Sequence, residues 1–115
     1  MRRRNVQALS IFLVFYIGLG VVLAAWQERF IYLPDEQDFW NCPAAARAQL
    51  APEIHNGTRL YLSKAVASNT PVAVVYHGNA GSACDRTYYV SSFAKAGYAT
   101  ILVEYAGYSA DPVPP

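Results

Sequence analysis

The chain of 115 residues has little charge of either sign and no excess of basic residues. Nine lysines and arginines stand against eight acidic residues, for a net charge of +1 at pH 7. Three of those nine, Arg2 to Arg4, precede an apolar run, which leaves six basic against eight acidic residues in the remainder. Proteins that bind nucleic acid need a basic surface to neutralise phosphates. We therefore expect no nucleic-acid partner.

Motifs for metals and phosphates are also missing. No group of His, Cys, Asp or Glu has the spacing of metal ligands, and no phosphate loop of the G-x-x-x-x-G-K type occurs. The sequence therefore predicts no metal site. Its length allows one domain at most, because part of it does not belong to a globular core.

One long hydrophobic run is present near the N-terminus. No charged residue occurs from Asn5 to Gln27, and the centre, Ile11 to Trp26, is almost wholly apolar. An α-helix of ~20 such residues crosses the ~30 Å hydrocarbon layer of a membrane. The preceding arginines favour a cytoplasmic N-terminus, so we predict a single-pass membrane protein whose remainder lies on the outer (periplasmic, extracellular or lumenal) side.

A cleaved signal peptide is the competing interpretation, because it too has a basic stretch before an apolar one. Residues 22–24 (Val-Leu-Ala) offer a small-residue cleavage pattern. However, the apolar run exceeds the usual ~7–15 residues, and Trp-Gln-Glu-Arg at 26–29 is typical of a membrane interface. We predict an uncleaved anchor over residues 1–27 and a second region over residues 28–115.

Two cysteines, Cys42 and Cys84, follow the anchor and would face an oxidising compartment. Two interpretations are possible at this point: a disulfide between them, or two separate, partly buried thiols. Sequence alone does not show whether two cysteines come within bonding distance.

The residue pattern after the anchor predicts both strands and helices. An irregular lead over Glu28–Pro52 holds one short helix near Ala44–Leu50. Asn-Gly at 56–57 is a strong hairpin-turn signal, although Asn-Gly-Thr at 56–58 also fits an N-glycosylation acceptor. Four strands are predicted, at residues 53–55, 58–65, 71–77 and 99–105.

A β-strand, a helix and a second strand are predicted over residues 71–105. The first strand is continuously β-branched and aromatic, which is typical of a strand buried on both faces of a parallel sheet. A helix over residues 83–96 would place Tyr89, Phe93 and Ala96 on one apolar face. Its start is predicted as a capping box of Ser and Asp at positions 82 and 85, and its end at Gly97.

The loop His77–Gly81 follows the first of these strands, at the edge where open α/β sheets bind ligands. Gly78 and Gly81 allow positive φ and leave backbone N–H groups free to face an anion or an oxyanion. These residues alone do not exclude the alternative interpretation, an ordinary glycine-rich turn in which His77 packs locally. Glu104, at the end of an apolar strand, is expected to be a hydrogen-bonded structural acid.

Three motifs in order, ERFIYLP, VVYHGNAG and ILVEYAGYS, resemble the front half of membrane-anchored serine hydrolases of the α/β-hydrolase family with an H-G-N-x-G loop. The resemblance runs from Glu28 to Pro115. Ala106 replaces the family's usual arginine, and Ser109 stands where glycine is common. The resemblance implies an α/β fold, here a truncated α/β-hydrolase sheet with its first strands and first crossover helix. It further implies hydrolysis of an ester, thioester or amide through an acyl-serine, without metal or organic cofactor.

The resemblance also implies roles for the loop. A backbone N–H of Asn79 or Ala80 would donate to the tetrahedral oxyanion, and His77, Gly78 and Gly81 would support the loop. His77 is then structural and is not the general base.

The nucleophile of such an enzyme is missing from the sequence. This fold needs a serine in G-x-S-x-G, then an acid, then a histidine, and no such pentapeptide occurs. Ser109 lacks the closing glycine and follows the wrong strand. We therefore expect no catalytic residue here. We interpret the chain as an N-terminal fragment that is inactive alone.

A complementary C-terminal chain would supply the missing residues, and only then would a small-molecule or acyl substrate bind. By the family's strand order, the strand at 71–77 would pair with 99–105 and leave its other edge unpaired, which is an aggregation risk. Two alternatives stay open: a membrane-tethered interaction or structural half-domain that pairs with a second chain, and a decayed pseudoenzyme.

Overall fold

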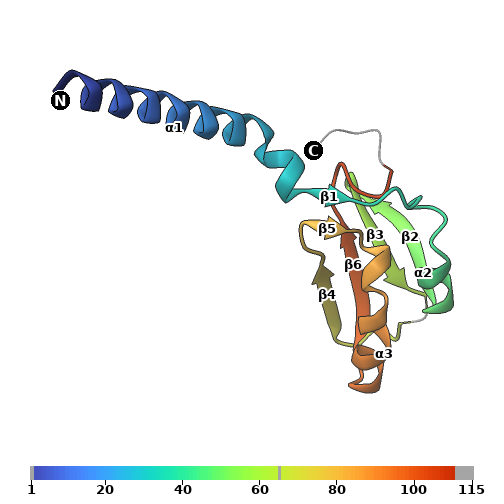
Figure 1. Ribbon diagram of the computed structural model, residues 1–115. Coiled ribbons are helices and arrows are strands. Elements are labelled where there is room, and N and C mark those ends of the chain that lie inside the picture. Colours follow the sequence, from blue (N-terminus) through green and yellow to red (C-terminus); the bar gives the residue numbers. More distant parts are fainter. Residues whose placement is uncertain (1, 65, 111–115) are drawn as a thin grey trace. The chain divides into compact units, whose positions relative to one another are not determined.

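The computed structural model describes residues 2–64 and 66–110, and the chain divides into two compact units, Met1–Tyr32 and Leu33–Pro115. The first contains one helix, α1 (Arg2–Ile31) (Figure 1). Its 27-residue span Asn5–Ile31 is long and apolar enough to cross a membrane. The predicted apolar segment is therefore a helix, and it continues four residues beyond Gln27.

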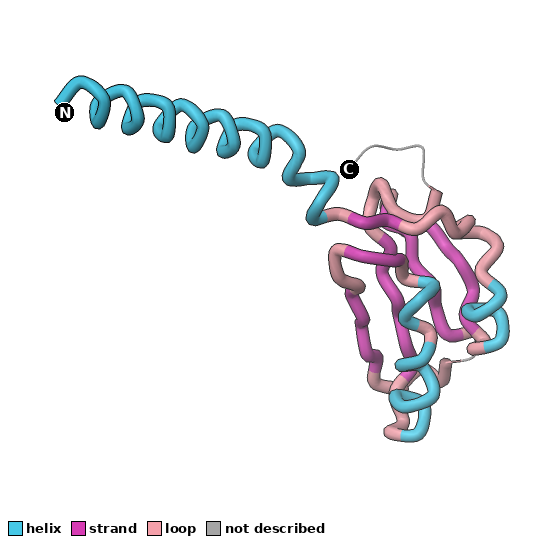
Figure 2. The backbone as a smooth tube through the Cα atoms, viewed as in Figure 1, coloured by secondary structure: helices cyan, strands magenta, loops and turns pink. Residues whose placement is uncertain are grey.

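The second unit has mixed helix and sheet, in agreement with the predicted α/β class. Its four-stranded sheet has the order β2-β3-β6-β4 (Figure 2). The β3 strand is antiparallel to β2 and β6, whereas β4 is parallel to β6. All four predicted strands are present: β2 (Leu50–His55), β3 (Thr58–Ser63), β4 (Val72–Tyr76) and β6 (Ala99–Glu104).

The turn between β2 and β3 forms at the predicted residues. Asn56 and Gly57 have φ values of 49° and 81°, and His55 pairs directly with Thr58 across the two-residue loop. Positive φ at both central residues is what a type I′ hairpin turn requires. Pro52 lies within β2, which tolerates it because β2 is an edge strand of this sheet.

The connection from β4 to β6 differs from the predicted single helix. It consists of the short two-residue strand β5 (Ala80–Gly81), a 3₁₀ turn η1 (Cys84–Arg86) and the helix α3 (Tyr88–Lys95). Gly97 has a φ of 83°, as the predicted helix end requires.

Only half of the predicted capping box forms. The Ser82 N–H donates to Asp85 Oδ2 over 3.0 Å, but the Ser82 hydroxyl donates to Asp35 Oδ2 over 2.8 Å instead of capping the helix. A carboxylate is the stronger acceptor for a hydroxyl, because charge-assisted hydrogen bonds are stronger than neutral ones.

The predicted apolar face of the helix is wrong. Val90 is the buried residue of α3, whereas Tyr89 is 40% exposed and Ala96 is exposed as well. The spacing of Tyr89, Phe93 and Ala96 places them on one side of α3, but it does not show which side meets the sheet, and the side that enters the core is that of Val90.

One face of the sheet carries the core. The helix α2 (Pro43–Arg47), predicted near Ala44–Leu50, packs there with η1 and α3. Tyr61 is fully buried, and its hydroxyl donates to the Phe39 carbonyl over 2.8 Å. Burial raises the pKa of the Tyr61 phenol well above its usual range, with a smaller contribution from the charge of Glu104. The core residues are Phe39, Cys42, Ala45, Leu50, Tyr61, Ala83, Cys84, Val90 and Leu102.

Cys42 and Cys84 form a disulfide, with their Cα atoms 6.0 Å apart. It joins the residue before α2 to the first residue of η1. The question that the sequence left open is therefore answered in favour of the bond.

The opposite face of the sheet, which we call the open face, is only partly covered by described residues, and Val103 on this face is 7% exposed. The strand β4 is half-exposed there, with Val74 50% and Tyr76 63% exposed, so the prediction of a strand buried on both faces is wrong. No helix within the described residues packs on this side. The strand order also leaves β4 with β6 as its single neighbour in the sheet, as expected. The register places these residues on the open face: Leu60, Leu62, Val72, Val74, Tyr76, Ala99, Ile101 and Val103.

Candidate functional site

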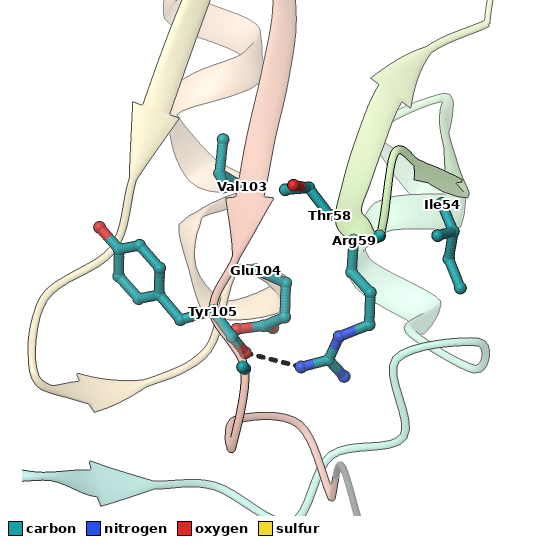
Figure 3. A pocket seen from close by; sticks show the side chains of 8 residues that line it. Ile54, Thr58, Arg59, Val103, Glu104 and Tyr105 are labelled. Atoms are coloured by element: carbon teal, nitrogen blue, oxygen red, sulfur yellow. Dashed lines mark hydrogen bonds between the residues drawn. The ribbon is translucent and has the colours of Figure 1, made fainter. Parts of the chain in front are cut away.

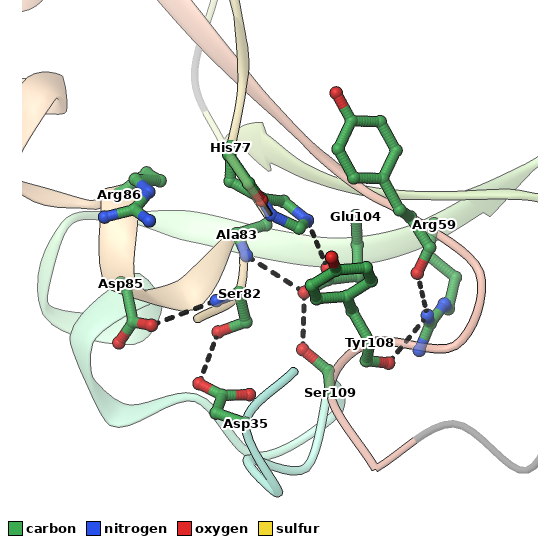
Figure 4. Close-up of polar contacts among 12 residues, drawn as sticks. Asp35, Arg59, His77, Ser82, Ala83, Asp85, Arg86, Glu104, Tyr108 and Ser109 are labelled. Carbon is green, nitrogen blue, oxygen red and sulfur yellow. Dashed lines mark hydrogen bonds and ion pairs between the residues drawn. The ribbon is translucent and has the colours of Figure 1, made fainter. Parts of the chain in front are cut away.

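The candidate site lies at the carboxyl ends of β4 and β6, where two loops meet (Figure 4). One is the loop His77–Gly81 after β4, and the other runs from Tyr105 to Ala110 after β6. Parallel strands place their carboxyl ends at the same edge of a sheet, which is where open α/β sheets bind ligands.

A buried carboxylate, Glu104, connects these loops. Its Oε1 lies 2.8 Å from Nε2 of His77, and its Oε2 accepts the Ala83 N–H over 3.0 Å. The Ser109 hydroxyl donates to the same Oε2. Glu104 thus holds the loop after β4, the start of η1 and the loop after β6 together. The hydrogen-bonded acid that the sequence predicts at this position is present.

Both nitrogens of His77 are hydrogen-bonded. The Nδ1 lies 2.8 Å from the Gly78 carbonyl, which can only accept, so Nδ1 carries a hydrogen. The Nε2 shares one proton with Glu104. The ring is enclosed by Tyr105 and Tyr108, whose centroids are 4.5 and 4.7 Å away. No nitrogen of His77 is free to accept a proton from a ligand, which fits a structural role.

Asn79 and Ala80 are exposed residues, and strand pairing directs their backbone. The strand β5 pairs in parallel with β1 (Leu33–Pro34), and the Leu33 N–H donates to the Asn79 carbonyl over 2.7 Å. In a parallel ladder the bonds to Leu33 come from the residues on either side of its partner, so the Ala80 N–H points away from β1. The Asn79 N–H has no acceptor among the described residues.

Further contacts fix the loop after β6. The Tyr108 hydroxyl donates to the Asn79 carbonyl over 3.1 Å. The Arg59 guanidinium donates to the carbonyls of Tyr105 and Tyr108 over 2.6 and 2.9 Å. These bonds tie β3 to the loop after β6, and that loop in turn to the loop after β4.

A shallow hollow of about 410 Å³ lies beside this site, at the end of the β2–β3 hairpin (Figure 3). Figure 3 shows the Arg59 guanidinium crossing it toward the Tyr105 carbonyl. The lining residues are Ile54, Gly57, Thr58, Arg59, Val103, Glu104, Tyr105 and Ala106. None of the loop residues 77–81 is among them, so this hollow is separate from the exposed N–H groups.

Gly81 is the loop residue most sensitive to substitution. Its φ is 75°, and a Cβ there would lie 2.3 Å from Asp85 Oδ2, the acceptor of the Ser82 N–H. We expect Gly81→Ala to cost about 1–3 kcal/mol of stability through backbone strain and displacement of Asp85, measured by urea unfolding of the full chain in detergent. Gly78→Ala is the matched control, because a Cβ there meets nothing within 4 Å. Equal losses for the two variants would contradict this account.

Two residues of the site were not predicted from the sequence. Asp35 lies in the irregular lead and binds Ser82, and Arg59 lies on a strand whose alternation gives no sign of a partner 46 residues away. Neither contact leaves a local sequence signal, because both depend on how distant segments meet.

Comparison with family models, with curated proteins and with solved structures finds no match to this chain. In the part of the chain that the structure describes, no group of three His, Cys, Asp or Glu side chains could hold a metal ion.

Proposed function

We propose that this chain is the N-terminal, membrane-anchored portion of a serine hydrolase of the α/β-hydrolase type. It supplies the oxyanion loop, and a second segment supplies the serine, the acid and the base. The observation that carries the proposal is the exposed pair Asn79 and Ala80 beyond the carboxyl end of β4, where the Leu33 N–H and the Tyr108 hydroxyl donate to the Asn79 carbonyl and β5 pairs with β1. The resemblance of three ordered motifs to serine hydrolases supports acyl-serine hydrolysis as the reaction.

The chemistry needs rigid N–H donors. An oxyanion hole stabilises charge that develops in the transition state, and it does so because its donors are already oriented. Here the loop is held by β1 on one side and by the Glu104–His77 contact on the other. Such a frame allows the N–H groups to face an acyl oxygen without reorganisation.

The loop after β6 supports the resemblance at a position where the sequence departs from the family. Ser109 stands where glycine is common, and its φ is 54°, in the left-handed region that favours glycine. Its hydroxyl is buried against Glu104 and is not placed against a histidine base. Ser109 therefore fits a structural role and does not fit that of the nucleophile.

The open face and the free edge of β4 are where the second segment would bind. A parallel strand would add to β4, and a helix following it would cover Val72 and Val74, because βαβ crossovers place helices on the faces of parallel sheets. The same surfaces would serve the alternative, a structural half-domain without activity. A reaction that depends on the catalytic serine distinguishes the hydrolase from the inactive half-domain.

The anchor and the disulfide support a common location. We propose that α1 spans the membrane with its N-terminus in the cytoplasm, guided by the arginines before it. The Cys42–Cys84 disulfide then lies in the oxidising compartment in which such bonds persist.

A fluorophosphonate probe, which reacts with the activated serine of such hydrolases, tests the function. The full chain alone in detergent should not be labelled. Membranes of the source cell should contain a labelled protein or complex whose peptides include those of this chain. A matched sample preincubated with unlabelled probe controls for non-specific reaction. Labelling of the purified chain, or labelled serine hydrolases that never include its peptides, would contradict the proposal.

A further inference from the structure

The loop of the candidate site is bonded to the residue that almost directly follows the anchor. The last residue of α1 is Ile31, and Leu33 donates its N–H to the Asn79 carbonyl over 2.7 Å. Leu33 and Pro34 then pair with Ala80 and Gly81. One residue, Tyr32, therefore separates α1 from β1, the strand that pairs with the loop.

Chain length limits how far this loop can lie from the membrane surface. A residue spans at most ~3.3–3.6 Å, so Leu33 lies within about 14 Å of Arg29, the last charged residue of α1, for any orientation of the two units. The headgroup layer is itself about 5–8 Å thick on each side of the hydrocarbon. If Arg29 marks the interface, the loop lies in or just above the headgroups.

The side chains next to the loop suit that location. Leu33 is 56% exposed, and Tyr76, directly before His77, stacks on Tyr105 with centroids 6.2 Å apart. Both tyrosines are exposed on the surface of the second unit. Tyrosine is enriched at membrane interfaces because its ring is apolar and its hydroxyl is polar.

We propose that the loop His77–Gly81 is held at the membrane surface and receives its substrate from the bilayer. The substrate class is then an amphiphilic acyl ester, whose acyl chain stays in the lipid while its ester reaches the N–H groups of Asn79 and Ala80. This inference rests on the proposed function, including the membrane-spanning α1. A freely diffusing, short-chain ester gains nothing from such a location.

The depth of the loop is measured with spin labels on the full chain in nanodiscs that contain a nickel-chelating headgroup lipid. Both native cysteines are in the disulfide, so an introduced cysteine is the single reactive thiol. Gly78→Cys labels the loop, where a side chain meets open space, and Asn69→Cys labels the connection before β4, at the other end of that strand. We expect relaxation by nickel to be several-fold stronger at position 78 than at position 69.

A tether variant and a ligand titration complete the test. Twelve Gly/Ser residues inserted after Ile31 should abolish the difference between the two labels. In membranes of the source cell, 1-palmitoylglycerol should slow fluorophosphonate labelling of the complex that contains this chain, whereas triacetin at the same concentration should not. Equal relaxation at both labels would overturn the membrane location. A response to triacetin alone, or to neither ester, would overturn the substrate class.

The spin-label outcomes are separate from the fluorophosphonate result. If nickel relaxes the label at position 78 strongly but this chain is never found with a fluorophosphonate-labelled protein, the membrane location holds and the hydrolase function is wrong. A labelled complex whose loop lies far from the headgroups would keep the hydrolase and remove the lipid substrate.

Discussion

Replacing Glu104 by alanine is expected to destabilise the second unit by about 3–5 kcal/mol, because a buried donor left without its acceptor costs about 1–3 kcal/mol. Three groups would lose their acceptor: the His77 ring, the Ala83 N–H and the Ser109 hydroxyl. Each is buried, so water does not replace the lost bond without opening the structure. Hydrogen exchange of the β6 amides in the full chain should accelerate by roughly 150- to 5,000-fold.

Two further variants separate this cause from a general effect of removing an acid. Glu53→Ala removes an exposed acid on the edge strand β2 and should change stability by no more than about 0.5 kcal/mol. Glu104→Gln keeps the size of the side chain and one acceptor oxygen, so its loss should fall between the two. A Glu104→Ala variant with the exchange rates of Glu53→Ala would show that the contacts at Glu104 do not hold the loops.

Reduction of the Cys42–Cys84 bond is expected to cost up to about 4 kcal/mol. The bond closes a loop between residues 42 positions apart, and the chain-entropy estimate for such a loop gives about this value. Urea unfolding of the full chain in detergent, with and without a phosphine reductant, measures the loss. The midpoint should fall on reduction.

The double variant Cys42→Ala, Cys84→Ala controls for effects of the reductant itself. Its midpoint should lie near that of the reduced chain and should not move when the reductant is added. If alkylation proves the bond broken and the midpoint stays unchanged, the disulfide does not stabilise the unit.

The fold was predictable where local chemistry decides it. The apolar run gave α1, Asn56 and Gly57 gave the hairpin, and Gly97 gave the end of α3. The loop His77–Gly81 was located for the same reason, since an apolar strand that ends in a glycine-rich turn is a local pattern.

The rest of the site depends on contacts between distant segments. Periodicity placed Tyr89 inside, but the side of α3 that packs into the core is that of Val90, and the spacing alone does not choose between the two sides. Ser82 was expected to cap a helix, but Asp35, 47 residues earlier, accepts its hydroxyl hydrogen. A local sequence pattern does not reveal these contacts, because they form only when the folded sheet brings distant segments together.

The pairing of β1 with β5 has a consequence for the order of events during synthesis. Leu33 leaves the ribosome soon after the anchor, but its partner Ala80 follows only when the intervening segment has been made. At ~5–20 residues per second, that interval is a few seconds. During it the lead has no partner strand, and the bond to Cys84 cannot yet form. The anchor helix and β1 are therefore made before the loop that pairs with β1, and the disulfide forms only after that loop has been made.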